Sequence, residues 1–171
     1  MRSMVNKWDR GVDFEVTYER LLRLVRRERR LRNRAYAFIL LIQLRNGSRV
    51  SEAVRAFREY VLTGKREVLV PLSKKKKHEE RLMVIPEVDF DRTAAVELLE
   101  VNERLLTKRV KMYALRKLKI NTHSLRYAFI TYLLKQGVNP AIVARVTGHT
   151  KLDFILHYTQ QKAAEEILRG L

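Results

Sequence analysis

Apolar residues recur at helical spacing along most of the chain, and this pattern predicts a mainly α-helical protein. Between Phe14 and Val25 they return every three or four positions while arginines occupy the other side, which is typical of an amphipathic surface helix. The stretch 36–44 is apolar nearly all round and is predicted to be the buried central helix. The turn signal Asn-Gly-Ser at 46–48 ends that helix.

A β pattern interrupts the helices in the middle of the chain. Segments 67–72 and 81–86 are rich in β-branched and aliphatic residues, and a polar run with four consecutive lysines separates them. They are predicted to form a small hairpin, with Pro71 marking an edge position. The predicted fold class is therefore mainly α with one small antiparallel sheet.

Capping residues suggest where the other helices begin. Ser48 is a natural N-cap for a helix over 50–62, which would place Arg49 in its first turn. Asp91 or Thr93 is expected to cap a helix over 94–103. Further helices are predicted over 105–119, from Asn121 or Thr122 onward, and over 140–146, 153–158 and 160–168.

The charge balance points to a polyanionic partner. The 171 residues suit a single domain, which we place at 14–171 after a short lead-in at 1–13. Lysine and arginine total 36 against 19 acidic residues, giving a formal net charge of +17. Nucleic acid is the commonest partner for such an excess.

Two absences narrow the class of protein. The sequence contains no cysteine, which excludes disulfides and thiolate metal sites. No apolar run approaches the roughly 18 residues of a membrane span, and no signal-peptide pattern stands at the N-terminus. We expect an intracellular, cytoplasmic protein.

The candidate chemistry lies toward the C-terminus. His123 and Arg126 are three residues apart and share a helix face; Gly148 and His149 follow, and Tyr158 stands nine residues further on. An arginine fork can hold two oxygens of a phosphodiester, and a histidine one turn away can exchange a proton with the same group. A tyrosine hydroxyl is a plausible nucleophile, but its pKa near ~10 requires a base or cationic surroundings.

These motifs carry a family resemblance. The tetrad HSLR at 123–126, the dipeptide GH at 148–149 and the tyrosine at 158 resemble, in order and spacing, the C-terminal half of tyrosine recombinases, the integrases and Xer-like resolvases. GSRVSEA at 47–53 is similar to the first motif of that family, an arginine followed three residues later by a carboxylate. The resemblance implies the tyrosine recombinase catalytic-domain fold along nearly the whole chain.

The resemblance also implies a role for each site residue. Tyr158 would attack the scissile phosphate and form a 3′-phosphotyrosyl link, with His123 assisting proton transfer. Glu52 would orient the first arginine or its neighbours. A lysine of the β-turn would protonate the leaving 5′ oxygen: Lys74 matches best, Lys75 is next, and any of the lysines at 74–77 is a candidate. The groups expected to stabilise charge on the phosphate are Arg49, Arg126, His149 and this lysine.

The implied reaction is site-specific DNA strand cleavage and rejoining without metal, cofactor or ATP. The implied partner is double-stranded DNA carrying attachment sites. We expect a monomer in solution that assembles into a tetramer on DNA. The apolar stripe of 163–171 is expected to pass between protomers, and the alternative is that it packs on its own domain. The N-terminal core-binding domain of the family is not recognised in the sequence, and the spacing of the motifs suits an archaeal or viral member.

Two alternatives remain open at this stage. One is a basic helical DNA-binding module without activity, in which 138–149 would form a helix-turn-helix fragment. The other is a type IB topoisomerase, which uses related chemistry, although chain length and the spacing from GH to Tyr158 favour a recombinase. His78 and His157 are interpreted as bystanders.

Overall fold

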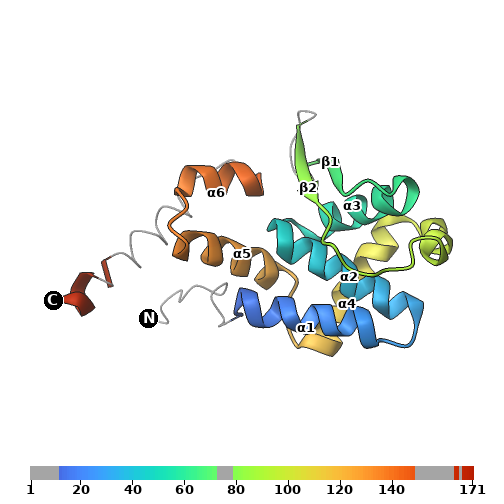
Figure 1. Cartoon of the computed structure of the whole chain (residues 1–171), viewed down its shortest axis with the longest axis horizontal. Coiled ribbons are helices and arrows are strands. Elements are labelled where there is room, and N and C mark those ends of the chain that lie inside the picture. Colours follow the sequence, from blue (N-terminus) through green and yellow to red (C-terminus); the bar gives the residue numbers. More distant parts are fainter. Residues whose placement is uncertain (1–11, 73–78, 149–163, 166) are drawn as a thin grey trace.

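The computed structural model describes residues 12–72, 79–148, 164, 165 and 167–171, and its elements confirm a mainly helical fold with one small antiparallel sheet (Figure 1). In chain order they are α1 (Phe14–Arg27), α2 (Leu31–Asn46), α3 (Val50–Thr63), β1 (Glu67–Pro71), β2 (Glu80–Val84), the 3-10 helix η1 (Ala94–Glu100), α4 (Glu103–Leu118), α5 (His123–Lys135) and α6 (Pro140–Thr147).

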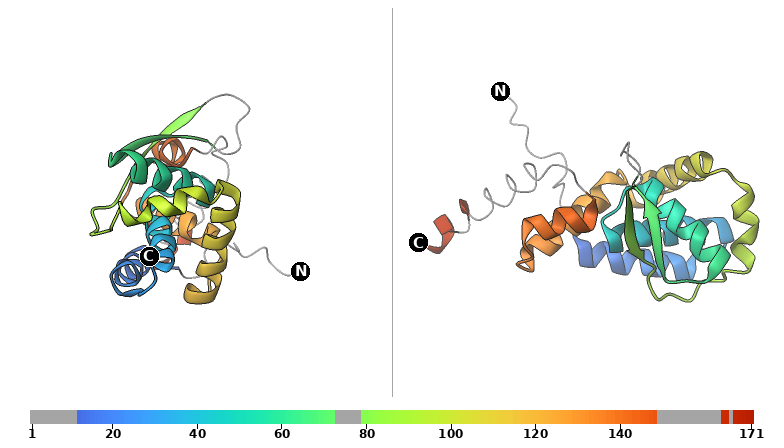
Figure 2. Two further views of the ribbon diagram at one scale, coloured as in Figure 1. Left: turned by 90° about the vertical axis from the view of Figure 1, so that its right-hand side faces the viewer. Right: turned by 90° about the horizontal axis from the view of Figure 1, so that it is seen from above.

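Helix α2 forms the centre of the molecule. Every residue from Ala35 to Leu44 is buried, because α1, α3, α4 and α5 all pack against this helix (Figure 2). Its Phe38 ring stacks on Phe90 at 4.7 Å between centroids and meets Phe57 edge-on at 6.2 Å. The predicted buried central helix is therefore confirmed.

The hairpin stands at one edge of the helical body (Figure 1). Its strands pair antiparallel from Glu67 opposite Val84 to Pro71 opposite Glu80. Burial alternates along both strands, so that Val68, Val70, Arg81 and Met83 point toward α2 and α3. An arginine therefore occupies one of the inward positions.

The start of α3 corrects one sequence prediction. The N-cap is Arg49 and not Ser48, since Arg49 has extended backbone angles (φ −72°, ψ 154°) and the helix begins at Val50. The backbone N–H of Arg49 donates to Glu52 Oε1 at 3.0 Å, as in a capping box. The Ser48 hydroxyl instead donates to the Arg49 carbonyl at 3.0 Å.

The helix predicted over 94–103 begins at Ala94 as expected but is a 3-10 helix and ends too early. The 3-10 helix η1 ends at Glu100, and Val101 is extended. Asn102 then caps a new helix, because its Oδ1 accepts from the Leu105 N–H at 2.8 Å. Asp91, one of the two predicted caps, does accept from the Ala94 N–H at 2.9 Å.

The remaining boundaries follow the predictions closely. Asn139 caps α6, with Pro140 in the first turn, and α5 begins directly after Thr122. The helices predicted over 153–158 and most of 160–168 lie outside the described residues. None of the helices in the described part of the chain combines the length and hydrophobicity needed to cross a bilayer.

Gly47 provides a test of the packing at the end of α2. Its φ is +59°, and an added Cβ would overlap the Phe129 ring of α5. Gly137 has a similar φ of +80°, but a Cβ added there would have no atom within 4 Å. A substitution at Gly137 therefore measures the backbone strain alone. We predict that Gly137→Ala costs about 1–2 kcal/mol of unfolding free energy. Gly47→Ala should cost about 3 kcal/mol or more, because overpacking is added to strain. Equal losses in urea unfolding would contradict the α2–α5 contact.

Candidate active site

A buried carboxylate gathers three arginines at the start of α3. Glu52 is completely buried, and Arg49 Nη1 lies 3.3 Å from its Oε2. Near its other oxygen, Oε1, lie Arg126 Nη1 of α5 at 3.9 Å and Arg81 Nη1 of β2 at 4.0 Å. Three guanidiniums against one carboxylate leave an excess of positive charge in a poorly solvated place, which favours an anion.

The two predicted arginines differ in exposure. The side chain of Arg49 is 22% exposed and that of Arg126 only 2%. Burial lowers the pKa of Arg126 to about 10; the charges of Arg49 and Arg81 act in the same direction, and Glu52 opposes them. Arg126 nevertheless stays protonated near neutral pH, so it is a permanent cation that is more deeply buried than Arg49.

His123 shares an open cleft with Arg49. The cleft has a volume of about 630 Å³, and its lining includes Arg49, Ser51, Lys111 and His123. His123 is exposed at the first position of α5, where its backbone N–H donates to Asn121 Oδ1 at 2.9 Å. The structure therefore places His123 beside the arginine cluster, on the solvent side.

The segment before Lys74 and the segment before His149, two other predicted site residues, lie next to each other. Gly148 (φ +74°) ends α6, and a Cβ added to it would lie 2.6 Å from Leu72 Cδ2 at the end of the hairpin. The predicted residues Lys74, Lys75, His149 and Tyr158 themselves lie outside the described residues, so their roles stay predictions.

Sequence reasoning overlooked two polar residues that organise the site. Gln43 is buried in α2, and its Nε2 donates to the carbonyls of Ser48 (3.2 Å) and Thr122 (3.0 Å). These carbonyls immediately precede Arg49 and His123, so one amide fixes the start of α3 relative to the start of α5. The sequence signal was a single amide within the otherwise apolar stretch 35–44.

Arg81 is the second overlooked residue. It occupies a buried position of β2 and donates to the carbonyls of Asn46 and Thr147. The sequence signal was the alternation of the strand: residues two apart face the same side, so Arg81 shares its side with the buried Met83.

Comparison with known proteins identifies the family. The chain is 43% identical over 167 residues to "Putative integrase ORF241" of Acidianus two-tailed virus, covering 96% of this chain and 68% of that protein. It is 34% identical over 160 residues to "Putative integrase V10" of Sputnik virophage, covering 77% and 69%. It is 30% identical over 200 residues to "Uncharacterized protein MJ0770" of Methanocaldococcus jannaschii, covering 96% and 88%.

The chain belongs to this integrase family, as the sequence motifs predicted. Two of these relatives are viral proteins, in keeping with the expected archaeal or viral type. No family model matches the chain, and no solved structure matches it.

Replacing Gln43 tests the link between the two helix starts. Gln43→Leu leaves the Ser48 and Thr122 carbonyls buried without this donor, so we predict a loss of about 1–3 kcal/mol of unfolding free energy. The exposed Gln136→Leu serves as the control and should change it by less than about 0.5 kcal/mol. Both are measured by urea unfolding, and a fully stable Gln43→Leu protein would refute the link.

Proposed function

We propose that the protein cleaves and rejoins DNA strands through a 3′-phosphotyrosyl intermediate, with Tyr158 as the nucleophile. The observation that best supports this is the cluster of Arg49 and Arg126 on the buried carboxylate of Glu52, next to a cleft that contains His123. Membership of an integrase family agrees with DNA as the substrate.

The proposed reaction is two successive transesterifications. The Tyr158 hydroxyl gives its proton to His123 and its oxygen forms a bond to phosphorus while the bond to the 5′ oxygen breaks, and Lys74 gives a proton to that leaving oxygen. A 5′ hydroxyl later attacks the phosphotyrosine and releases the tyrosine. The number of phosphodiester bonds is conserved, so the proposed reaction uses neither ATP nor a cofactor, and side-chain cations replace a metal.

The two arginines would contribute differently. Arg49 presents part of its guanidinium to the cleft and would hold a non-bridging phosphate oxygen directly. Arg126 lies deeper, where its charge acts through a medium of low polarity and is less screened than a surface charge. His123 is exposed and lines the same cleft as Arg49, and in the proposed reaction it would exchange the proton of the tyrosine.

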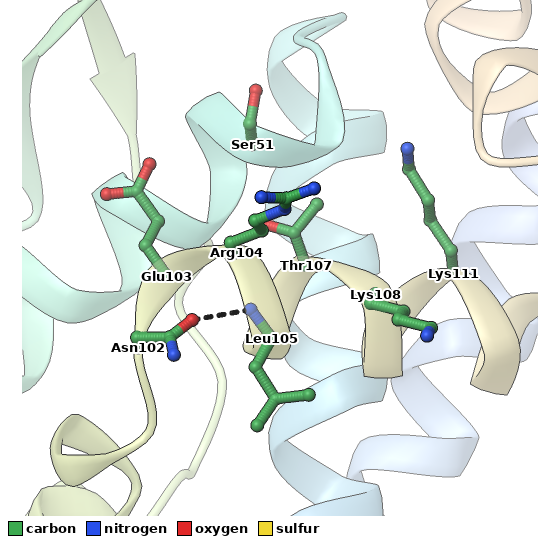
Figure 3. A pocket seen from close by; sticks show the side chains of 8 residues that line it. All are labelled: Ser51, Asn102, Glu103, Arg104, Leu105, Thr107, Lys108 and Lys111. Carbon is green, nitrogen blue, oxygen red and sulfur yellow. Dashed lines mark hydrogen bonds between the residues drawn. The ribbon is translucent and has the colours of Figure 1, made fainter.

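A second cleft extends the basic surface along α4. It has a volume of about 790 Å³ and shares Ser51, Thr107 and Lys111 with the first cleft (Figure 3). Its remaining lining residues are Asn102, Glu103, Arg104, Leu105 and Lys108. The carboxylate of Glu103 is paired with Arg55 at 2.6 Å. We propose that Arg104, Lys108 and Lys111 hold the DNA backbone next to the scissile phosphate.

The nucleophile is tested with a duplex that contains a nick near the cleavage site, which traps the covalent complex. Tyr158→Phe removes one oxygen and no charge, so we predict normal DNA binding and no covalent complex on a denaturing gel. Tyr127→Phe, whose ring lies 5.8 Å from His123, is the matched control and should still attach.

The reaction should proceed in EDTA. Covalent attachment by Tyr158→Phe would show that another tyrosine is the nucleophile. Tight binding without attachment by the unmodified protein would favour a non-catalytic DNA-binding module. Complete inhibition by EDTA would indicate a metal-dependent nuclease.

The α4 surface is tested through the salt dependence of binding. Each lost phosphate contact should reduce the slope of log K against log salt by about 0.9. We therefore predict a shallower slope for Lys108→Gln/Lys111→Gln than for the unmodified protein. The control pair is Arg26→Gln/Arg27→Gln on α1, whose side chains line neither cleft. Equal slopes for the two pairs would place the DNA elsewhere.

A further inference from the structure

Arg81 joins three parts of the site through one side chain. It stands opposite Val70 in the hairpin, and its guanidinium points inward. Nη2 donates to the Asn46 carbonyl at 2.6 Å and Nη1 to the Thr147 carbonyl at 3.4 Å. The same Nη1 lies 4.0 Å from Glu52 Oε1.

The two carbonyls explain why a buried cation is stable at this place. Asn46 is the last residue of α2 and Thr147 the last residue of α6. Carbonyls at a helix C-terminus have no partner within the helix and carry the negative end of its dipole. One guanidinium therefore serves two helix ends, and the carboxylate of Glu52 balances its charge.

Arg81 also determines the surroundings of Arg126. Both guanidiniums approach the same oxygen, Glu52 Oε1, at 4.0 and 3.9 Å. Arg81 occupies the carbonyls of Asn46 and Thr147, which would otherwise attract a neighbouring guanidinium. Its positive charge also repels Arg126 from that side. Without Arg81, Arg126 would be free to shift away from the cleft.

We infer that Arg81 is a positioning residue: it keeps Glu52 and Arg126 aligned with Arg49 and locks the end of α6 against them. This inference rests on the proposed strand-cleavage reaction, in which Arg49 and Arg126 act on the phosphate. Arg81 itself does not touch the DNA.

The test compares Arg81→Met and Arg81→Lys with Arg66→Met. Arg66 is the matched control because it anchors the same hairpin through other partners: its Nη1 donates to the Pro86 carbonyl at 2.8 Å, and its guanidinium lies over the Tyr60 ring. Single-turnover attachment to the nicked duplex is measured at saturating DNA, together with DNA affinity and the fraction of active protein.

Arg81→Met should attach about 100-fold more slowly per active molecule, with affinity changed by less than about threefold, because misplaced groups impair the chemical step more than binding. Arg81→Lys should be about 10-fold slower, since one ammonium cannot reproduce the planar fork that reaches both carbonyls. Arg66→Met should keep the rate of the unmodified protein.

A second measurement needs neither DNA nor activity. The Nε–H NMR signal of Arg126 should shift or disappear in both Arg81 variants and stay in place in Arg66→Met. If the unmodified protein fails to attach to DNA, the proposed function is wrong, and this signal still decides the role of Arg81.

If both Arg81 variants attach to DNA at the unmodified rate per active molecule, the inference is overturned. A lower melting temperature of the variants would not rescue it, because Arg81 would then have only a structural role. An unmoved Arg126 signal would overturn it as well. If Arg81→Met does not fold, Arg81→Lys, which retains the charge, decides the question.

Discussion

The carboxylate of Glu52 is completely buried, and three guanidiniums within 4.0 Å supply the positive charge that its burial requires. The dependence is mutual, because three guanidiniums gathered in a poorly solvated place repel one another unless an anion lies between them. Neither the carboxylate nor the arginines would be stable here alone. The start of α3, strand β2 and helix α5 are therefore tied to one another by charge as well as by apolar packing.

The C-terminal end of α2 connects this charge cluster to the core. Gln43 donates to the backbone just before Arg49 and just before His123. Asn46 exchanges two hydrogen bonds with Val84 of the hairpin, at 2.8 and 2.9 Å, and its own carbonyl accepts from Arg81. The buried helix α2 thus ends in polar residues that bond to the segments carrying the site. These hydrogen bonds hold the arginines in place against the rigid core.

The sequence predicted those parts of the structure that depend on local pattern. The stretch that is apolar nearly all round identified α2, and strand composition identified the hairpin. The motifs predicted Arg49, Glu52 and Arg126 as site residues, and the structure places these three side chains together. The cap of α3 was predicted wrongly because Ser48 was chosen on residue preference alone. The carboxylate of Glu52 instead accepts from the Arg49 N–H, which makes Arg49 the cap.

The roles of Gln43 and Arg81 could not be read from their surroundings in the chain. Their partners are distant in sequence: Thr122 for Gln43, and Asn46 and Thr147 for Arg81. A buried polar side chain requires a partner, but the sequence does not say which element supplies it. A lone polar residue in an apolar segment, as Gln43 is, is therefore a useful marker of a site even when its contacts are unknown.

The net charge of the cluster bears on how the proposed reaction would be accelerated. Three guanidiniums and one carboxylate leave a charge of +2. A phosphodiester carries one negative charge, whereas the pentacoordinate phosphate formed when a tyrosine oxygen attacks carries a second. The cluster therefore matches the charge of the transition state more closely than that of the bound substrate, which is the condition for lowering a barrier rather than merely tightening binding. Because Glu52 and Arg81 hold the charges in place before DNA arrives, little reorganisation would be needed at the moment of reaction.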